Sequence, residues 1–214
     1  MANANICQCK NMKTVLLTPK GDQIIKVPED TQFVLRFPDA EATANIVFSF
    51  EKEGVSAEVL GLFSLKPGNK LNLTTTALHK VPHASCITKI KGVLYSDSEA
   101  FYIGKILINK KAQNTSSFLE NNTLVLGDNT KNTSQPILEI DADDVKASHG
   151  STTGRVNEEQ IYYLMSRGFT REESVRLIVE GFFEKELSLI LDSGVREEIH
   201  KTLIIDAKIN INEH

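Results

Sequence analysis

The sequence predicts a mainly β protein with an α-helical region at its C-terminal end, and three observations support this. Short β-type runs separated by turn residues follow one another from about Thr14 to Ile140. Leu71 and Leu73 alternate with polar residues at the period of a half-buried strand. Helical patterns occupy the chain after His149. We therefore place a β domain at 14–148 and a helical domain at 149–207, between tails at 1–13 and 208–214.

The predicted strands are nine runs rich in apolar residues. In order they are TVLLTP (14–19), TQFVLRFP (31–38), NIVFSF (45–50), AEVLGLFSL (57–65), KLNLTTTAL (70–78), CITKIKGVLYS (86–96), AFYIGKILIN (100–109), TLVLGD (123–128) and PILEID (136–141). Turn sequences such as KPGNK (66–70), YSDSE (95–99) and GDNTKNTSQP (127–136) separate them. This pattern fits a sandwich, a barrel or a parallel β-helix, and periodicity alone does not choose among the three.

Two helices and a weaker third are predicted after the strands. Their expected caps are Asn157 with Gln160 as its capping-box partner, Gly168 as a C′ residue, and Thr170 with Glu173 as its partner. Apolar residues from 175 to 191 recur at helical spacing and form a stripe that suits packing against the end of the β domain. The sequence VREEIHKTLIIDAKI predicts the third helix.

Composition excludes several classes of function. A length of 214 residues with 41% hydrophobic and 24% charged residues is typical of a soluble globular protein. The net charge of -4 lacks the basic character of a nucleic-acid-binding domain. Without a signal sequence or an apolar span, a cytoplasmic protein with no membrane contact is expected.

The residues also argue against two specific activities. The chain has no tryptophan and few aromatic residues, which argues against a β-helix enzyme that acts on polysaccharide through paired carboxylates. It also lacks the GxxxxGK[ST] pattern that cradles phosphates, so any bound ATP would belong to a partner.

Three cysteines are present, and each has two interpretations. Cys7 and Cys9 lie two residues apart and could face one soft metal, but two thiolates do not complete a tetrahedral site, and they also fit incidental thiols in a tail. Cys86 is the only cysteine within the predicted β domain. It fits a buried core residue, or a sulfur relay if it faces a polar channel.

Two segments carry a resemblance to a known family. Residues 136–187, from PILEIDADDVKASHGSTTG to the second helix, and residues 91–115, KGVLYSDSEAFYIGKILINKKAQNT, resemble the C-terminal part of SufB/SufD proteins, which are scaffolds of SUF iron-sulfur cluster assembly. The resemblance implies a right-handed parallel β-helix followed by a helical domain. It also implies a SufC-type ATPase held by the C-terminal helices, and a dimer formed through the end of the β-helix with a SufB-like subunit or a second copy. Any iron-sulfur cluster would be transient, with none bound tightly. The resemblance further implies that the protein is not an enzyme.

The resemblance also implies site residues. His149 matches the motif histidine that lies near the subunit interface and is implicated in cluster formation, while the residues alone also allow a histidine that ties a strand-to-helix corner by hydrogen bonds. Tyr162, Arg167, Gly168 and Phe169 flank the turn where an ATPase would bind. The acids Glu139, Asp141, Asp143 and Asp144 fit a solvated strand end or a negative edge that concentrates iron cations, with the first three expected on one face of a strand.

Three positions differ from the pattern of the SufB or SufD branch, and they indicate which branch the sequence resembles. Asn121 stands where SufB carries an acceptor cysteine, Gly150 where SufB has glutamate, and Ala147 where SufD often has cysteine. The SHG motif and the short chain favour a shortened SufD-like scaffold component. The alternative is a non-catalytic adaptor that keeps ATPase binding but assembles no cluster.

Overall fold

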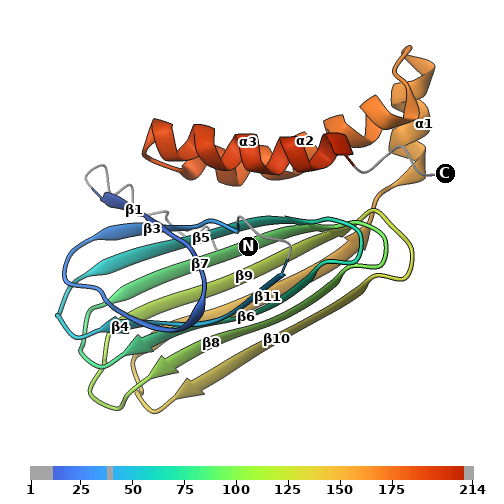
Figure 1. Cartoon of the computed structure of the whole chain (residues 1–214). Coiled ribbons are helices and arrows are strands. Elements are labelled where there is room, and N and C mark those ends of the chain that lie inside the picture. Colours follow the sequence, from blue (N-terminus) through green and yellow to red (C-terminus); the bar gives the residue numbers. More distant parts are fainter. Residues whose placement is uncertain (1–11, 38–40, 210–214) are drawn as a thin grey trace.

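The computed structural model describes residues 12–37 and 41–209, which form eleven strands and three helices (Figure 1). One sheet has six strands in the order β1 (Lys13–Leu17), β3 (Thr31–Leu35), β5 (Ser56–Leu65), β7 (Ser85–Leu94), β9 (Thr115–Val125) and β11 (Val145–Arg155). The other has five strands in the order β10 (Lys131–Ile140), β8 (Glu99–Ile108), β6 (Lys70–His79), β4 (Glu41–Phe50) and β2 (Gly21–Lys26). We call these sheet A and sheet B.

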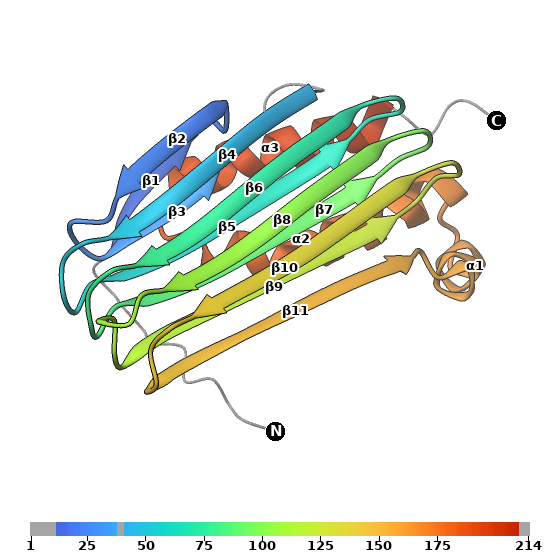
Figure 2. The same cartoon turned by 90° about the horizontal axis from the view of Figure 1, so that it is seen from below.

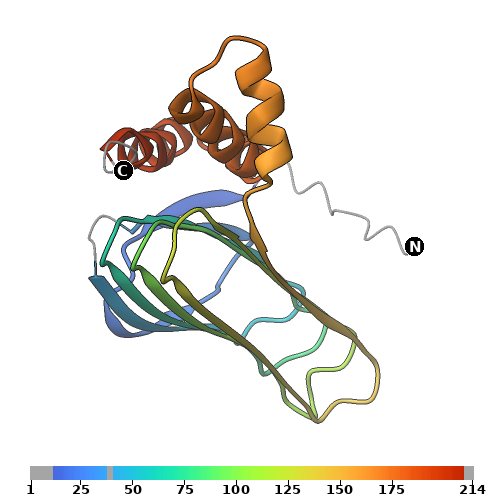
Figure 3. The ribbon, with the colours of Figure 1, turned by 90° about the vertical axis from the view of Figure 1, so that its right-hand side faces the viewer.

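The chain passes alternately between the two sheets, so each strand pairs in parallel with the strand one turn later. Ser56 of β5 lies opposite Ser85 of β7, and every other recorded ladder is also parallel. Figure 3 looks along this coil and shows two facing sheets joined by turns. The expected parallel β-helix is confirmed, and the sandwich and the barrel are excluded.

The core fills the space between the sheets, which we call the lumen. Leu71 and Leu73 point into it with 3% and 1% exposure, as their alternation predicted. Glycines appear where the sheets leave no room for a side chain. A Cβ atom at Gly92 would lie 2.1 Å from the ring of Phe63. The lumen is therefore close-packed over most of its length.

Two strands were not predicted, and both are edge strands. Strand β11 carries mostly polar or small residues, and β2 has two adjacent isoleucines of which Ile24 is 76% exposed, so neither strand shows the apolar alternation that marked the other runs. The sequence analysis ended the β domain at residue 148, but β11 continues to Arg155. The junction with the helices therefore lies after His149 and not at it.

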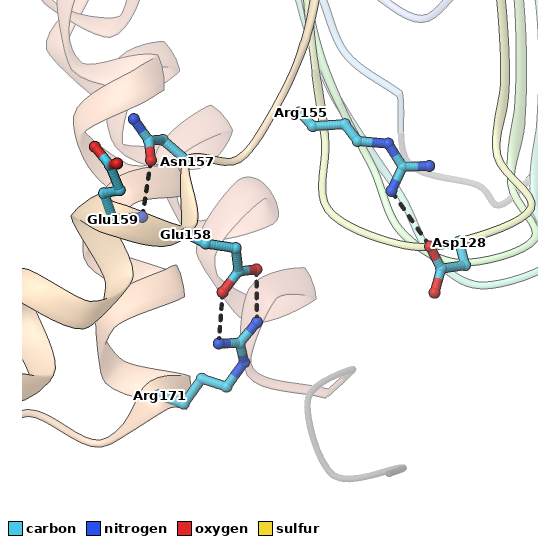
Figure 4. Close-up of polar contacts among 6 residues, drawn as sticks. All are labelled: Asp128, Arg155, Asn157, Glu158, Glu159 and Arg171. Atoms are coloured by element: carbon cyan, nitrogen blue, oxygen red, sulfur yellow. Dashed lines mark hydrogen bonds and ion pairs between the residues drawn. The ribbon is translucent and has the colours of Figure 1, made fainter.

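The three helices are α1 (Glu158–Ser166), α2 (Arg171–Leu189) and α3 (Ser193–Ile209). The N-cap of α1 is Asn157, as predicted, but its side chain accepts from the N–H of Glu159 (Figure 4). The N–H of Gln160 donates to the backbone carbonyl of Asn157, so the expected capping box does not form there. None of the helices within the described residues is long and apolar enough to cross a membrane.

The other two predicted caps are confirmed. Thr170 and Glu173 form a full capping box at the start of α2. Gly168 has a φ of 99°, a conformation that favours glycine over other residues and so ends α1.

Helices α2 and α3 cover the outer face of sheet A, while α1 projects away from both sheets (Figures 1 and 3). The contact is an apolar cluster with members from the sheet (Val34, Leu60, Leu62, Val93) and from the helices (Val179, Phe183, Leu187, Ile190, Ile199, Leu203). The apolar stripe thus packs on the β domain, but along the outer face of sheet A and not at the predicted end, and Leu191 of the stripe is 48% exposed.

Polar groups reinforce this contact at specific points. The amide of Gln32, a fully buried residue of β3, donates to the carbonyl of Leu189 and accepts from the N–H of Leu191, both at the end of α2. Lys91 of β7 forms an ion pair with Glu186 of α2. These contacts fix the α2–α3 pair to the β-helix.

Candidate functional site

His149 lies in the middle of β11, in register with Leu119 of β9 and Thr88 of β7. Leu119 points into the lumen, because a Cβ atom at Gly104 of the facing sheet would lie 2.6 Å from its methyl groups. His149 shares that face of sheet A and is exposed, because β11 is the last strand of the sheet. The interpretation of His149 as a strand-to-helix corner is wrong: the residue lies on the lumen side of an edge strand.

Strands β10 and β11 form the open end of the β-helix, and Figure 2 shows both at the same side of the molecule. Their side chains meet across the lumen. The hydroxyls of Ser134 and Ser151 are 3.0 Å apart, and the Asn132 amide donates to the Thr153 hydroxyl at 2.7 Å. One half of the open end is therefore a polar network that joins the two sheets.

Asn121 extends this network into the lumen. Its amide nitrogen donates to the Ser134 hydroxyl at 2.8 Å, while its carbonyl oxygen is buried without a partner among the described residues. The Thr123 hydroxyl is likewise buried and unpartnered. On the other half of the end, Leu138 and Ala147 pack against the apolar core. Asn121 and Ala147, the two positions considered for thiols, thus face the lumen without a sulfur atom.

Cys86 lies deeper in the lumen, on β7. It is fully buried, its sulfur lies 3.7 Å from the Thr88 hydroxyl, and burial raises the pKa of its thiol to about 12. The thiol is therefore protonated at neutral pH, which favours the core interpretation over a sulfur relay. Cys7 and Cys9 lie outside the described residues.

A buried histidine lies near Cys86. His79 stacks on Phe50 with ring centroids 4.4 Å apart, and its Nε2 atom lies 3.1 Å from the hydroxyl of Ser117, the residue paired with Cys86. Burial lowers the pKa of His79 to about 4, so this imidazole is neutral. The lumen is thus neutral at this depth as well as close-packed.

The four acids do not share a strand face. Asp141, Asp143 and Asp144 lie in the turn between β10 and β11, and only Glu139 belongs to a strand. All four are exposed. Within residues 12–37 and 41–209, none of them belongs to a group of three or more histidine, cysteine or acidic side chains able to hold a metal ion. A preformed metal centre is therefore not present in this part of the chain.

The second candidate surface lies on α1 and the turn after it. Tyr162 and Phe169 are 64% and 41% exposed, and the Arg167 guanidinium lies 5.3 Å from the ring centroid of Tyr163. Tyr163, 59% exposed, was missed in the sequence, although its spacing of four from Arg167 on a helix was visible. A groove of about 500 Å³ separates α1 from α2 beside this patch.

Helix α1 is held in place by few contacts. Ile161 is its only buried residue, and Arg171 makes two hydrogen bonds of 2.9 and 2.8 Å to the carboxylate of Glu158 (Figure 4). That pairing lowers the pKa of Glu158 through the hydrogen bonds from Arg171. The aromatic patch is thus displayed on a helix anchored mainly at its first turn.

A family model described as "SUF system FeS cluster assembly, SufBD core domain" matches residues 31–182. This range contains both the open end of the β-helix and the aromatic patch of α1.

Curated relatives agree with the family model. The chain is 36% identical over 165 residues to an iron-sulfur cluster assembly SufBD family protein of Mycobacterium leprae, covering 73% of this chain and 42% of the relative. It is 34% identical over 109 residues to the iron-sulfur cluster assembly protein SufD of Escherichia coli, covering 51% and 26%. With SufD of Bacillus subtilis it shares 31% over 138 residues, covering 64% and 31%. The chain thus spans less than half the length of these relatives.

Proposed function

The chain belongs to the SufBD family of the SUF iron-sulfur cluster assembly system, and we propose that it is a SufD-like scaffold component of such an assembly complex. The observation that carries the proposal is that the family match runs through two separate exposed surfaces of this chain, the open end of the β-helix and the α1 patch. The open end would receive a second subunit, either a SufB-like protein or another copy. The α1 patch would bind a SufC-type ATPase.

The α1 patch supports an ATPase contact through its composition. Exposed tyrosine, phenylalanine and arginine side chains are the residue types that dominate binding energy at protein interfaces. Tyr162, Arg167 and Phe169 are all exposed within six residues of the left-handed turn at Gly168. Because α2 is fixed to sheet A through Glu186 and Lys91, a force applied at α1 would be transmitted to the β-helix.

His149 supports a role at the open end. An imidazole can ligate iron or form a hydrogen bond, and the imidazole of His149 faces the lumen at an unpaired edge. One histidine without thiolates does not hold a cluster. The cluster would therefore be a cargo assembled between subunits, with thiolates from the partner. The proposal gives this chain no catalytic step of its own.

Co-precipitation with a SufC-type ATPase tests the α1 surface. A Tyr162→Ala/Arg167→Ala variant should lose most of the bound ATPase, while Phe101→Ala, an equally simple change of an exposed aromatic residue on sheet B, should bind normally. Unchanged binding by the double variant would remove this surface from the proposal.

Anaerobic iron and sulfide reconstitution of the complex tests the open end. His149→Ala should reduce the cluster absorption, and His83→Ala, which changes an exposed histidine of a turn, should not. The adaptor remains a second candidate, because the one cysteine among the described residues is buried. Retained ATPase binding with no cluster in any variant would favour the adaptor.

A further inference from the structure

Helices α2 and α3 leave part of the outer face of sheet A uncovered. The apolar cluster beneath them contains residues of β3, β5 and β7, and among the described residues none from β11. A groove of about 490 Å³ lies over β7, β9 and β11, and its described lining includes no residue of a helix. Figure 2 shows these strands as neighbours, with β11 outermost. A groove of this volume is within the range of sites that bind small molecules.

Two rows of side chains form the middle of the groove. One row crosses β7, β9 and β11 at Ile87, Phe118 and Ser148, and the next at Lys89, Glu120 and Gly150. The first row provides an apolar wall from Ile87 and Phe118. The second row provides two charges of opposite sign and an open space, because nothing lies within 4 Å of the position that a Cβ atom at Gly150 would take. The groove therefore combines an apolar wall with one positive and one negative group.

The two charges of the groove do not pair with each other. Lys89 and Glu120 lie directly across from each other on neighbouring strands. The Glu120 carboxylate instead accepts a hydrogen bond of 2.7 Å from the side-chain amide of Asn122 on its own strand. Lys89 is half-buried and forms no ion pair with any residue that the structure describes. A carboxylate accepts several hydrogen bonds and an ammonium group donates three, so both groups keep capacity for a ligand.

Other described residues near the groove do not neutralise Lys89. Lys91, the next outer residue of β7, adds a second positive charge, and Glu186 of α2 pairs with Lys91. The residues of β11 that line this side of the groove, Ser148 and Thr152, carry no charge. A half-buried ammonium group without a counter-ion is disfavoured, and a carboxylate from outside the chain would remove that cost.

We propose that this groove binds a small zwitterion with an apolar body, namely an α-amino acid with an apolar side chain. The ammonium group of Lys89 donates to the carboxylate of the ligand, the ammonium group of the ligand donates to Glu120, and the ligand side chain lies against Phe118. The two charges of an α-amino acid are attached to one carbon atom, so they can contact two residues that stand one strand spacing, about 4.8 Å, apart. A ligand with a single charge would face a like charge from Lys89 or Glu120. This binding activity does not depend on the proposed function.

The ligand would also contact the strand that carries His149. Ser148 and Gly150 flank His149 in the chain, and both line the groove. Strand β11 is paired with a described strand on one side only. Binding to the folded strand therefore stabilises it against local opening and orders the backbone around His149.

A chemical-shift titration of the full chain tests the class of ligand. L-Phenylalanine and L-leucine are the probes, and we expect dissociation constants in the millimolar range with the largest shifts at the amides of Glu120 and Gly150. 3-Phenylpropionate lacks the ammonium group and 2-phenylethylamine lacks the carboxylate. Each should bind about tenfold more weakly than L-phenylalanine, because one charge-assisted hydrogen bond is lost. Equal binding by either analogue, or no binding by both amino acids, would overturn the proposal.

Substitutions in the groove test its location. Gly150→Leu should abolish binding because the new side chain fills the open space, whereas Gly154→Leu makes the same change on the same strand outside the groove and should bind normally. Lys89→Met should weaken binding about tenfold, and Lys105→Met on the outer face of sheet B should not. Thermal unfolding identifies any variant that fails to fold, and the changes on β7 and β11 test the groove independently. Unweakened binding by folded Gly150→Leu or Lys89→Met would place the ligand elsewhere and contradict the proposal.

Hydrogen exchange tests the effect on β11. Saturating L-phenylalanine should slow amide exchange in β11 around His149 and leave exchange in β2, which lies far from the groove, unchanged. The Gly150→Leu variant should show no slowing on addition of L-phenylalanine. Unchanged exchange in β11 of the parent at saturation would refute the ordering of the backbone around His149.

Discussion

Lys91 of β7 and Glu186 of α2 form an ion pair in which only 12% and 4% of the two side chains are exposed. The Lys91 ammonium also lies 4.4 Å from the ring centroid of Phe182. The pair thus joins the β-helix to the helical layer inside a dry contact. Removing one partner leaves an uncompensated buried charge, whereas removing both does not.

A double-substitution cycle should reveal that asymmetry. Lys91→Met and Glu186→Leu should each lower the free energy of unfolding by about 3–5 kcal/mol, and the combined variant should recover most of the loss. Urea unfolding measures all four proteins. The exposed pair Lys201–Glu197 provides the control, because Lys201→Met should change stability by less than about 1 kcal/mol. Additive losses in the cycle would mean that the two charges do not interact.

Gln32→Leu should release the end of α2 from sheet A. The Leu189 carbonyl and the Leu191 N–H would lose their partner. Each of these groups that stays buried without a hydrogen bond would lower the free energy of unfolding by about 1–3 kcal/mol. Hydrogen exchange should then become faster at the end of α2. Gln160→Leu on exposed α1 should shift stability by no more than about 0.5 kcal/mol. An unchanged exchange rate at the end of α2 would contradict the role given to Gln32.

Stability should fall on acidification because of His79. Burial lowers the pKa of His79 to about 4 in the folded chain, while the unfolded chain binds the proton near its ordinary pKa of 6.5. The folded state is therefore disfavoured progressively as pH falls from about 6.5 towards 4, by about 2 kcal/mol between about pH 7 and about pH 5. Urea unfolding at these two pH values measures the change.

The His79→Gln variant should lose this pH dependence over the same interval, even though its stability near pH 7 is lower. His83→Gln should keep it, because His83 is more than half exposed. The carboxylates with lowered pKa values, such as Glu51 beside Lys26 and Lys80, contribute their own loss only at lower pH. If the free energy of unfolding of the His79→Gln variant falls with pH as steeply as that of the parent, a group other than His79 titrates in this interval.

Gly92→Ala should destabilise the β-helix by about 1–3 kcal/mol, because the added methyl group would overlap the Phe63 ring. Gly154→Ala adds the same group to a strand where nothing lies within 4 Å, and it should be neutral or slightly stabilising. Thermal unfolding of the two variants compares them directly. Equal melting temperatures would show that the lumen can relax around Phe63.

The sequence predicted the strands that are buried on one face and missed those that are not. Leu71 and Leu73 alternate because they face a packed lumen. Strand β11 has polar or small residues on both faces, since one face lies at the open end and the other forms a groove. No apolar period exists there to detect, and so His149 was assigned to a corner.

The register between neighbouring strands could not be predicted from the sequence either. Lys70, Glu99 and Lys131 lie in one row of sheet B, but they are spaced by 29 and then 32 residues, so no fixed repeat places them together. The helices were easier to predict because caps such as Thr170 with Glu173 are local. Lys91 and Glu186 are far apart in the sequence, and only the folded structure brings their side chains into contact.

The parallel ladder makes the molecule modular along its axis. Each turn pairs only with the turns on either side, so adding or removing turns at the β1 end would leave the pairing of β10 and β11 unaltered. The length of the coil and the identity of its final surface can therefore vary independently. Proteins of very different length can in this way end in the same last turn.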